Sequence, residues 1–153
     1  MSAPRDQHFL TDQRAVEKIA GFVDVSGRRV LEIGPGGGVL TRALLDRGAE
    51  VVAVEVDPVL VEELGIAFAD EIEEGRLRII PGDAKKVDLP SFDIVVANLP
   101  YSVSSKITFR LLEIGFEVAV LMYQKEFAQR MIARPGTPDV GRLSVMVQTY
   151  ASV

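Results

Sequence analysis

The sequence RVLEIGPGGG, residues Arg29–Gly38, runs from a short apolar segment directly into a glycine-rich turn. The apolar part is typical of a buried β-strand, and Val39–Arg47, which follows, has the apolar spacing of a helix that ends at Gly48. Glycines at such a junction let the backbone turn tightly and pass close to a ligand. The stretch predicts a strand–loop–helix unit, and its loop is either a ligand-binding turn or a purely structural one.

Strand-like and helix-like segments alternate outward from this unit. The predicted strands are Arg29–Ile33, Val51–Val56, Leu77–Ile80, Asp93–Leu99 and Val118–Tyr123. The predicted helices are Ala15–Val23, Val39–Arg47, Val59–Ala69, Ser104–Glu113 and Lys125–Ala133. Arg134–Gly141 is predicted as a loop, and Arg142–Tyr150 suits a helix or a strand. The alternation predicts an α/β fold with a mostly parallel sheet and helices on both faces, which binds its ligand at the carboxyl ends of the strands.

The composition is typical of one folded domain and excludes several kinds of site. Of the 153 residues, 48% are hydrophobic and 25% charged, and cysteine is absent, so disulfides and thiolate chemistry are excluded. The first ten residues lack an apolar signal core and no long uncharged apolar run occurs, so we expect a cytoplasmic protein without a membrane span. The net charge is −5, but Glu50–Glu74 holds nine acids and no base. This distribution predicts an acidic and a mildly basic surface, and it leaves both RNA and small-molecule partners open.

The first predicted strand end has the pattern E-x-G-x-G-x-G, formed by Glu32, Gly34, Gly36 and Gly38. A dinucleotide-binding loop would need its third glycine where Val39 stands, and no G-K-[ST] phosphate loop follows. The next two strand ends carry the acids Glu55 and Asp83. Glu55, 21 residues after Gly34, is placed to accept from both ribose hydroxyls, unless it is simply a solvated acid.

Asp83, at the third strand end, could accept from an adenine amino group or form a local Asx turn. The fourth end, Asn98-Leu99-Pro100-Tyr101, is the most specific pattern in the chain. The Asn98 side-chain oxygen and the Leu99 carbonyl could hold both hydrogens of an exocyclic amine while Tyr101 stacks on its base. The alternative is a turn followed by a core tyrosine. Together the four ends describe a nucleoside with an amino-acid tail, which favours S-adenosylmethionine over a dinucleotide.

With these residues in place, the chain closely resembles the small-subunit ribosomal RNA adenine N6-dimethyltransferase family, in an archaeal-like form. The matching segments are Asp6–Leu10, Glu32–Thr41, Glu55–Asp57, Gly82–Ala84, Asn98–Ser105, Gln124–Arg130 and Gly141–Gln148. The resemblance implies a Rossmann-like S-adenosylmethionine-dependent methyltransferase fold. It also implies dimethylation of two adjacent adenosines near the 3′ end of small-subunit rRNA in an immature ribosomal subunit, by an enzyme that needs no metal and is monomeric at full length.

The resemblance also assigns roles by position. It implies catalytic positions at Asn98, Leu99, Pro100 and Tyr101. It implies cofactor contacts at His8, Leu10, Glu32, Gly34, Gly36, Gly38, Glu55, Asp83, Ala84 and Asn98. Lys106, Lys125 and Arg130 are candidate RNA contacts, although the helix with the last two could equally be a solvated face. His8 could likewise be an ordinary surface histidine.

The sequence departs from the family pattern at both ends. Asp6 stands where the family has a glycine, and only Arg5 represents its basic arm. We expect residues 1–153 to form the cofactor-binding domain with five of the seven family strands, without the last strands and the small helical RNA-binding domain. The strand Val118–Tyr123 would then lie at an open sheet edge. Two other functions remain open: methylation of large-subunit rRNA, as in antibiotic-resistance enzymes, and a non-catalytic role in ribosome assembly.

Overall fold

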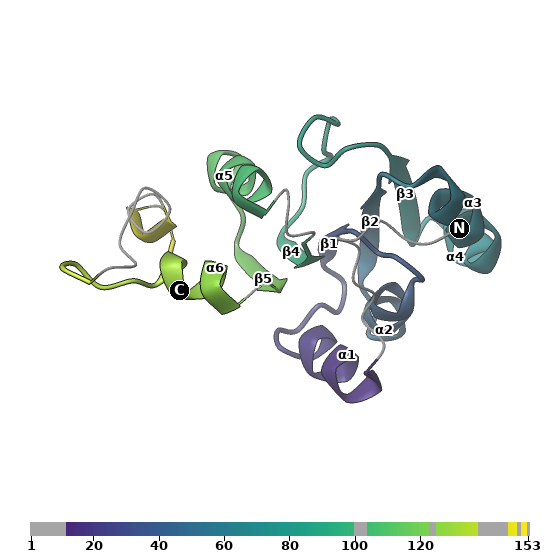
Figure 1. Ribbon diagram of the computed structural model, residues 1–153. Coiled ribbons are helices and arrows are strands. Elements are labelled where there is room, and N and C mark those ends of the chain that lie inside the picture. Colours follow the sequence, from purple (N-terminus) through teal and green to yellow (C-terminus); the bar gives the residue numbers. More distant parts are fainter. Residues whose placement is uncertain (1–11, 100–103, 123–124, 138–146, 150, 153) are drawn as a thin grey trace.

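A computed structural model describes residues 12–99, 104–122, 125–137, 147–149 and 151–152, with the backbone alone for 125–127. Five parallel strands form one sheet in the order β3-β2-β1-β4-β5. The strands are β1 (Arg29–Ile33), β2 (Glu50–Glu55), β3 (Leu77–Pro81), β4 (Ile94–Asn98) and β5 (Val118–Met122). The glycine-rich stretch therefore follows the central strand (Figure 1).

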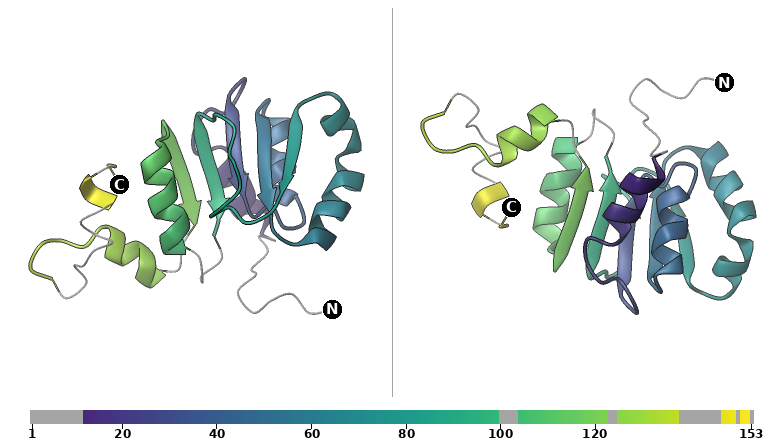
Figure 2. Two further views of the ribbon diagram at one scale, coloured as in Figure 1. Left: turned by 90° about the horizontal axis from the view of Figure 1, so that it is seen from above. Right: turned by 90° about the horizontal axis from the view of Figure 1, so that it is seen from below.

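Helices pack on both faces of the sheet, as the sequence predicts (Figure 2). On one face, α1 (Gln13–Ala20), α2 (Val39–Asp46) and α3 (Pro58–Ala67) cover alternate residues of the strands, such as Val30 and Val51. On the other face, α5 (Ser104–Ile114) covers the intervening residues, such as Leu31 and Val95. Because successive side chains of a strand point to opposite faces, the near-continuous apolar runs follow from burial on both sides.

The observed elements begin and end within two residues of the predicted bounds, except at the end of the first predicted helix. The first helix ends at Ala20, three residues before Val23, and Gly21 is its C-cap. The predicted helix Val59–Ala69 is broken at Phe68, after which α4 (Ala69–Glu73) begins. Phe68 is only 4% exposed, so its ring has to turn into the core, and the backbone bends there.

The remaining segments are short. The helix α6 (Lys125–Met131) ends two residues before the predicted Ala133. Residues 147–149 are helical, which resolves the open choice for that part of Arg142–Tyr150. Within the described part of the chain, β5 forms one edge of the sheet. None of the helices described is long and apolar enough to span a lipid bilayer.

Candidate functional site

Three of the predicted site residues lie in one row across the carboxyl edge of the sheet. Ile33 is in register with Val54 on one side and Ala97 on the other, so the next row contains Glu55, Gly34 and Asn98. A Cβ atom on Gly34 would lie 3.1 Å from the Asn98 carbonyl oxygen. The absence of a side chain at Gly34, where φ is +73°, thus lets the loop after β1 pass directly over the end of β4.

Gly38 is the second position where only glycine fits. It is the N-cap of α2 with φ of +87°, and an added Cβ would lie 2.6 Å from the Phe68 ring. Phe68 in turn lies under the guanidinium of Arg42, 4.4 Å from the ring centroid, and Arg42 pairs with Glu71 of α4. The bend between α3 and α4 therefore holds the start of α2 and the end of the glycine loop in place.

Glu55 is a buried carboxylate, 4% exposed, and not the solvated acid that the sequence also allowed. One of its oxygens accepts from the backbone N–H of Gly36 at 3.3 Å, and the other accepts from the backbone N–H of Asp57 at 3.0 Å. A carboxylate can accept about four hydrogen bonds. Glu55 is thus oriented by the backbone and keeps the capacity to accept from a pair of hydroxyls.

Glu32 is even more buried, 1% exposed, and accepts a 2.5 Å hydrogen bond from the Thr41 hydroxyl of α2. Burial raises the pKa of this carboxyl to about 7. The hydrogen bond from Thr41 lowers the pKa, and the negative charge of Glu55 raises it further. Glu32 ties the strand before the glycine loop to the helix after it. Its contact with a cofactor stays a prediction, and its observed hydrogen-bond donor is Thr41.

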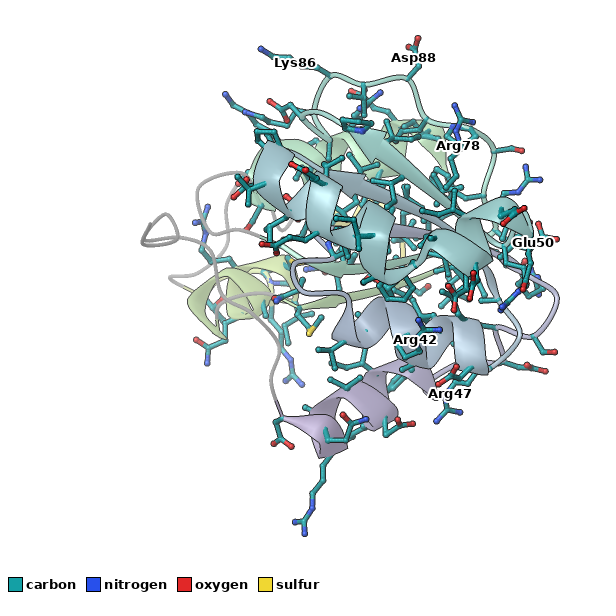
Figure 3. The ribbon with its side chains drawn as sticks, turned by 90° about the vertical axis from the view of Figure 1, so that its right-hand side faces the viewer. Arg42, Arg47, Glu50, Arg78, Lys86 and Asp88 are labelled. Carbon is teal, nitrogen blue, oxygen red and sulfur yellow. The ribbon has the colours of Figure 1, made fainter. Side chains whose placement is uncertain are left out.

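Asp83 lies in a tight turn after β3. Its side chain accepts from the backbone N–H of Lys85 at 2.9 Å, so the Asx turn considered from the sequence is present. The backbone N–H of Lys85 and its positive charge keep the pKa of Asp83 low despite some desolvation. The side chains of Lys86 and Asp88 project outward from this loop (Figure 3). The second oxygen of Asp83 lies 3.5 Å from the Lys85 Nζ atom.

Asn98 ends β4 half-buried, and Leu99 behind it is 3% exposed. Ala84 is buried in the same apolar cluster as Leu99, together with Ile107 and Leu111 of α5. The third and fourth strand ends are therefore packed against one helix. The predicted site residues His8, Leu10, Pro100 and Tyr101 lie outside the described residues.

The candidate RNA contacts lie on two helices beside β5. Lys106 is exposed in the first turn of α5, and Arg130 is exposed in the last turn of α6, which begins at Lys125. The far end of the sheet, next to β3, carries α3 and α4 (Figure 1). Exposed acids of these two helices and of the C-cap residue of α4 are Glu62, Glu63, Asp70, Glu73 and Glu74. The acidic segment of the sequence thus forms the surface at the end away from the candidate RNA contacts.

Sequence reasoning missed three residues that shape this site. Phe68 and Thr41 lie in helical segments in which another apolar or small residue would have given the same prediction. Arg110 of α5 donates to the carbonyl oxygens of Ala84 and Val87 in the loop after β3, 26 and 23 residues away in the sequence. A contact at that separation leaves no periodic signal, so only the three-dimensional structure reveals it.

Comparison with known proteins yields a family match over almost the whole chain. Residues 5–153 match the family model described as "Ribosomal RNA adenine dimethylase". A curated relative from Methanospirillum hungatei, "Probable ribosomal RNA small subunit methyltransferase A", is 66% identical over 151 residues, which cover 99% of this chain and 59% of the relative. One from Thermococcus onnurineus with the same name is 53% identical, with 96% of this chain and 53% of the relative covered. The chain thus spans little more than half the length of these proteins.

Two solved structures share the fold at comparable coverage. A dimethyladenosine transferase from Plasmodium falciparum superimposes with a TM-score of 0.77 at 36% identity, over 92% of this chain and 52% of that one. The 23S rRNA methyltransferase ErmE gives a TM-score of 0.73 at 30% identity, over 92% of this chain and 55% of that one. The five-stranded parallel sheet is thus the methyltransferase arrangement that the sequence predicts.

Proposed function

Because this chain belongs to the ribosomal RNA adenine dimethylase family, we propose that it transfers methyl groups from S-adenosylmethionine to N6 of two adjacent adenosines near the 3′ end of small-subunit rRNA. The archaeal relatives named above motivate the choice of RNA. The substrate in this proposal is an immature ribosomal subunit in the cytoplasm, and the protein acts as a monomer at full length.

The observation that carries the proposal is the row of Glu55, Gly34 and Asn98. Glu55 and Asn98 lie on strands either side of β1, so their backbones are separated by two inter-strand spacings, ~10 Å. Between them the glycine loop passes close to the edge of the sheet, where a Cβ atom on Gly34 would lie 3.1 Å from the Asn98 carbonyl oxygen. In this proposal Glu55 would hold the ribose of the cofactor, and Asn98 and Leu99 would hold the amine that receives its methyl group.

The residues at this edge suit S-adenosylmethionine, which supplies an electrophilic methyl group when it is bound. Glu55 has acceptor capacity left for the two ribose hydroxyls. In this proposal Asp83 accepts from the adenine amino group, and the buried Ala84 packs beside the ring. Gly34, Gly36 and Gly38 admit the amino-acid tail, while Glu32 holds their loop through Thr41. His8 and Leu10 are further proposed contacts of the cofactor.

The target amine is held by Asn98 and Leu99 in the proposed mechanism. Delocalisation into the adenine ring makes the N6 lone pair a weak nucleophile. Hydrogen bonds from both N6 hydrogens, to the Asn98 side-chain oxygen and the Leu99 carbonyl, favour a pyramidal nitrogen whose lone pair faces the methyl group. Pro100 keeps the carbonyl turned inward, and Tyr101 stacks on the base. The nitrogen forms its new N–C bond as the S–C bond breaks, and the N6 proton then leaves to water.

RNA capture is assigned to the basic side of the molecule. Lys106, Lys125 and Arg130 are the proposed phosphate contacts, and the acidic α3–α4 end faces away from the RNA. Phosphate contacts make binding depend on salt. RNA binding is therefore expected to weaken as the salt concentration rises, and more steeply than cofactor binding.

The test is methyl transfer from labelled S-adenosylmethionine to immature small subunits, followed by mass mapping of dimethyladenosine. Since the curated relatives are longer, the assay includes this chain and a chimera that continues it with the remaining residues of the Methanospirillum hungatei relative. Two adjacent dimethylated adenosines near the small-subunit 3′ end are expected. Large-subunit rRNA is the matched alternative substrate, because ErmE shares the fold and 30% of its aligned residues. Preferential labelling of that RNA would overturn the proposal.

Binding of S-adenosylmethionine without any transfer by the chimera would instead support a non-catalytic assembly role.

A further inference from the structure

The turn after β3 is tightly folded and is held by several hydrogen bonds. Gly82 has φ of +138°, and a Cβ there would lie 2.5 Å from the Val87 side chain, which folds back over it. The Asp83 carbonyl accepts from the backbone N–H groups of both Lys86 and Val87 at 2.9 Å. With the Asx hydrogen bond to Lys85, these contacts give the Asp83 side chain one defined direction.

Arg110 holds this turn from the neighbouring helix α5. One guanidinium nitrogen donates to the Ala84 carbonyl and the other to the Val87 carbonyl, each at 2.5 Å. The rigid planar fork of a guanidinium can satisfy two carbonyls at a fixed spacing, whereas a lysine ammonium is a single point of donation. Both bonds are part-buried, so water compensates poorly for their loss.

The same helix packs behind the other half of the site. Ile107 and Leu111, on either side of Arg110 in α5, contact the apolar cluster that contains Ala84 and Leu99. α5 also begins at Ser104, a few residues after the Asn98–Tyr101 stretch. Arg110 therefore adds a polar link between the turn that carries Asp83 and the helix that supports the end of β4.

We propose that Arg110 is a positioning residue for the nucleoside end of the cofactor site. It fixes the Asp83 turn through the Ala84 and Val87 carbonyls, so that Asp83 can distinguish the amino group of adenine from other ring substituents. This inference rests on the proposed function, because it assumes that Asp83 faces an adenosine. Arg110 does not itself contact the cofactor in this assignment.

The experiment compares two ligands, S-adenosylhomocysteine and S-inosylhomocysteine, which carries an oxygen where adenine has its amino group. Calorimetric titration gives the ratio of their dissociation constants for each variant, and thermal melting gives stability separately. Wild type is expected to prefer the adenine ligand by about 10-fold or more, because the mismatched oxygen would face the Asp83 carboxylate. Arg110→Gln is expected to reduce that preference to about 3-fold or less, mainly by weakening adenine binding.

Two further variants separate positioning from charge. Arg110→Lys keeps the positive charge but cannot bridge both carbonyls, so it should behave like Arg110→Gln. Lys86→Gln removes a positive charge from the same turn, where the side chain points outward, and should keep the wild-type preference (Figure 3). A loss of preference in Lys86→Gln as large as that in Arg110→Gln would overturn the proposal in favour of a charge effect.

A merely structural role for Arg110 predicts a lower melting temperature with an unchanged ligand ratio, and that result would also overturn the inference. Should Arg110→Gln fail to fold, the ratio measured for Arg110→Lys decides instead. Failure of wild type to bind S-adenosylhomocysteine at all would refute the proposed function. Wild-type binding with an Arg110→Gln ratio like that of wild type would refute only the role of Arg110.

Discussion

Replacing Glu32 by glutamine should remove a pH dependence from the stability of this protein. Burial raises the pKa of Glu32 from 4.5 to about 7 in the folded chain, so the folded state favours the neutral carboxyl. Because the folded-state pKa lies above the unfolded one, Glu32 contributes most to the free energy of unfolding below about pH 4.5. That contribution is lost as the pH rises through 7. The difference between the two values corresponds to about 3 kcal/mol between the protonated and ionised forms.

Urea unfolding at pH 5, 6, 7 and 8 measures this effect. The free energy of unfolding of wild type is expected to fall by about 2–3 kcal/mol from pH 5 to pH 8. In Glu32→Gln this part of the pH dependence should be absent, because glutamine does not titrate. Asp83 and Glu71, whose pKa values are lowered, stay ionised in the folded state across this window and contribute little slope above pH 5. Glu50→Gln, which removes an exposed carboxylate at the start of β2, is the matched control and should follow wild type. Parallel curves for wild type and Glu32→Gln would refute the reasoning.

Three further substitutions test the site. Gly38→Ala should lower the free energy of unfolding by at least about 2 kcal/mol in urea titrations, because the new side chain has a left-handed φ and overlaps Phe68. Gly37→Ala is the control: the space around Gly37 is open, so this variant should stay within about 0.5 kcal/mol of wild type. Glu55→Ala should weaken S-adenosylmethionine binding by about 1.5–3 kcal/mol in calorimetry, and unchanged affinity would remove Glu55 from the ribose site. Asn98→Ala in the chimera should reduce methyl transfer to immature subunits far more than cofactor affinity, and turnover near that of wild type would exclude Asn98 from the mechanism.

The sequence predicts the sheet and the four strand ends because those features depend on local patterns. Buried parallel strands have continuous apolar runs, and in an α/β fold the ligand-binding residues follow them directly. Glu55 and Asn98 could therefore be found by their place after a strand. The single row that they form with Gly34 depends on strand order, which the alternation of elements leaves undetermined and the structure supplies.

The sequence does not predict features that depend on packing between distant segments. Phe68 interrupts the helical segment between Pro58 and Glu73, and its ring fills the space over Gly38. Arg110 is one of several basic residues, and nothing near it in the sequence distinguishes a clamp from a solvated charge. Glu32 shows the same limit: its spacing from the glycines predicts a ligand site, whereas its hydrogen bond with Thr41 is seen only in the structure.

The central place of β1 has a consequence for the order in which the protein folds. β1 can pair with β2 after closing a loop of about twenty residues. Its pairing with β4 joins segments that are 64 residues apart, as in the register partners Val30 and Ile94. Long-range parallel pairing has a greater loop-closure entropy and forms slowly. The half of the edge with Glu55 should thus assemble before the half with Asn98. A ligand that needs both halves binds only the completed sheet, so cofactor at 100 times its dissociation constant should add about 2.7 kcal/mol to folding.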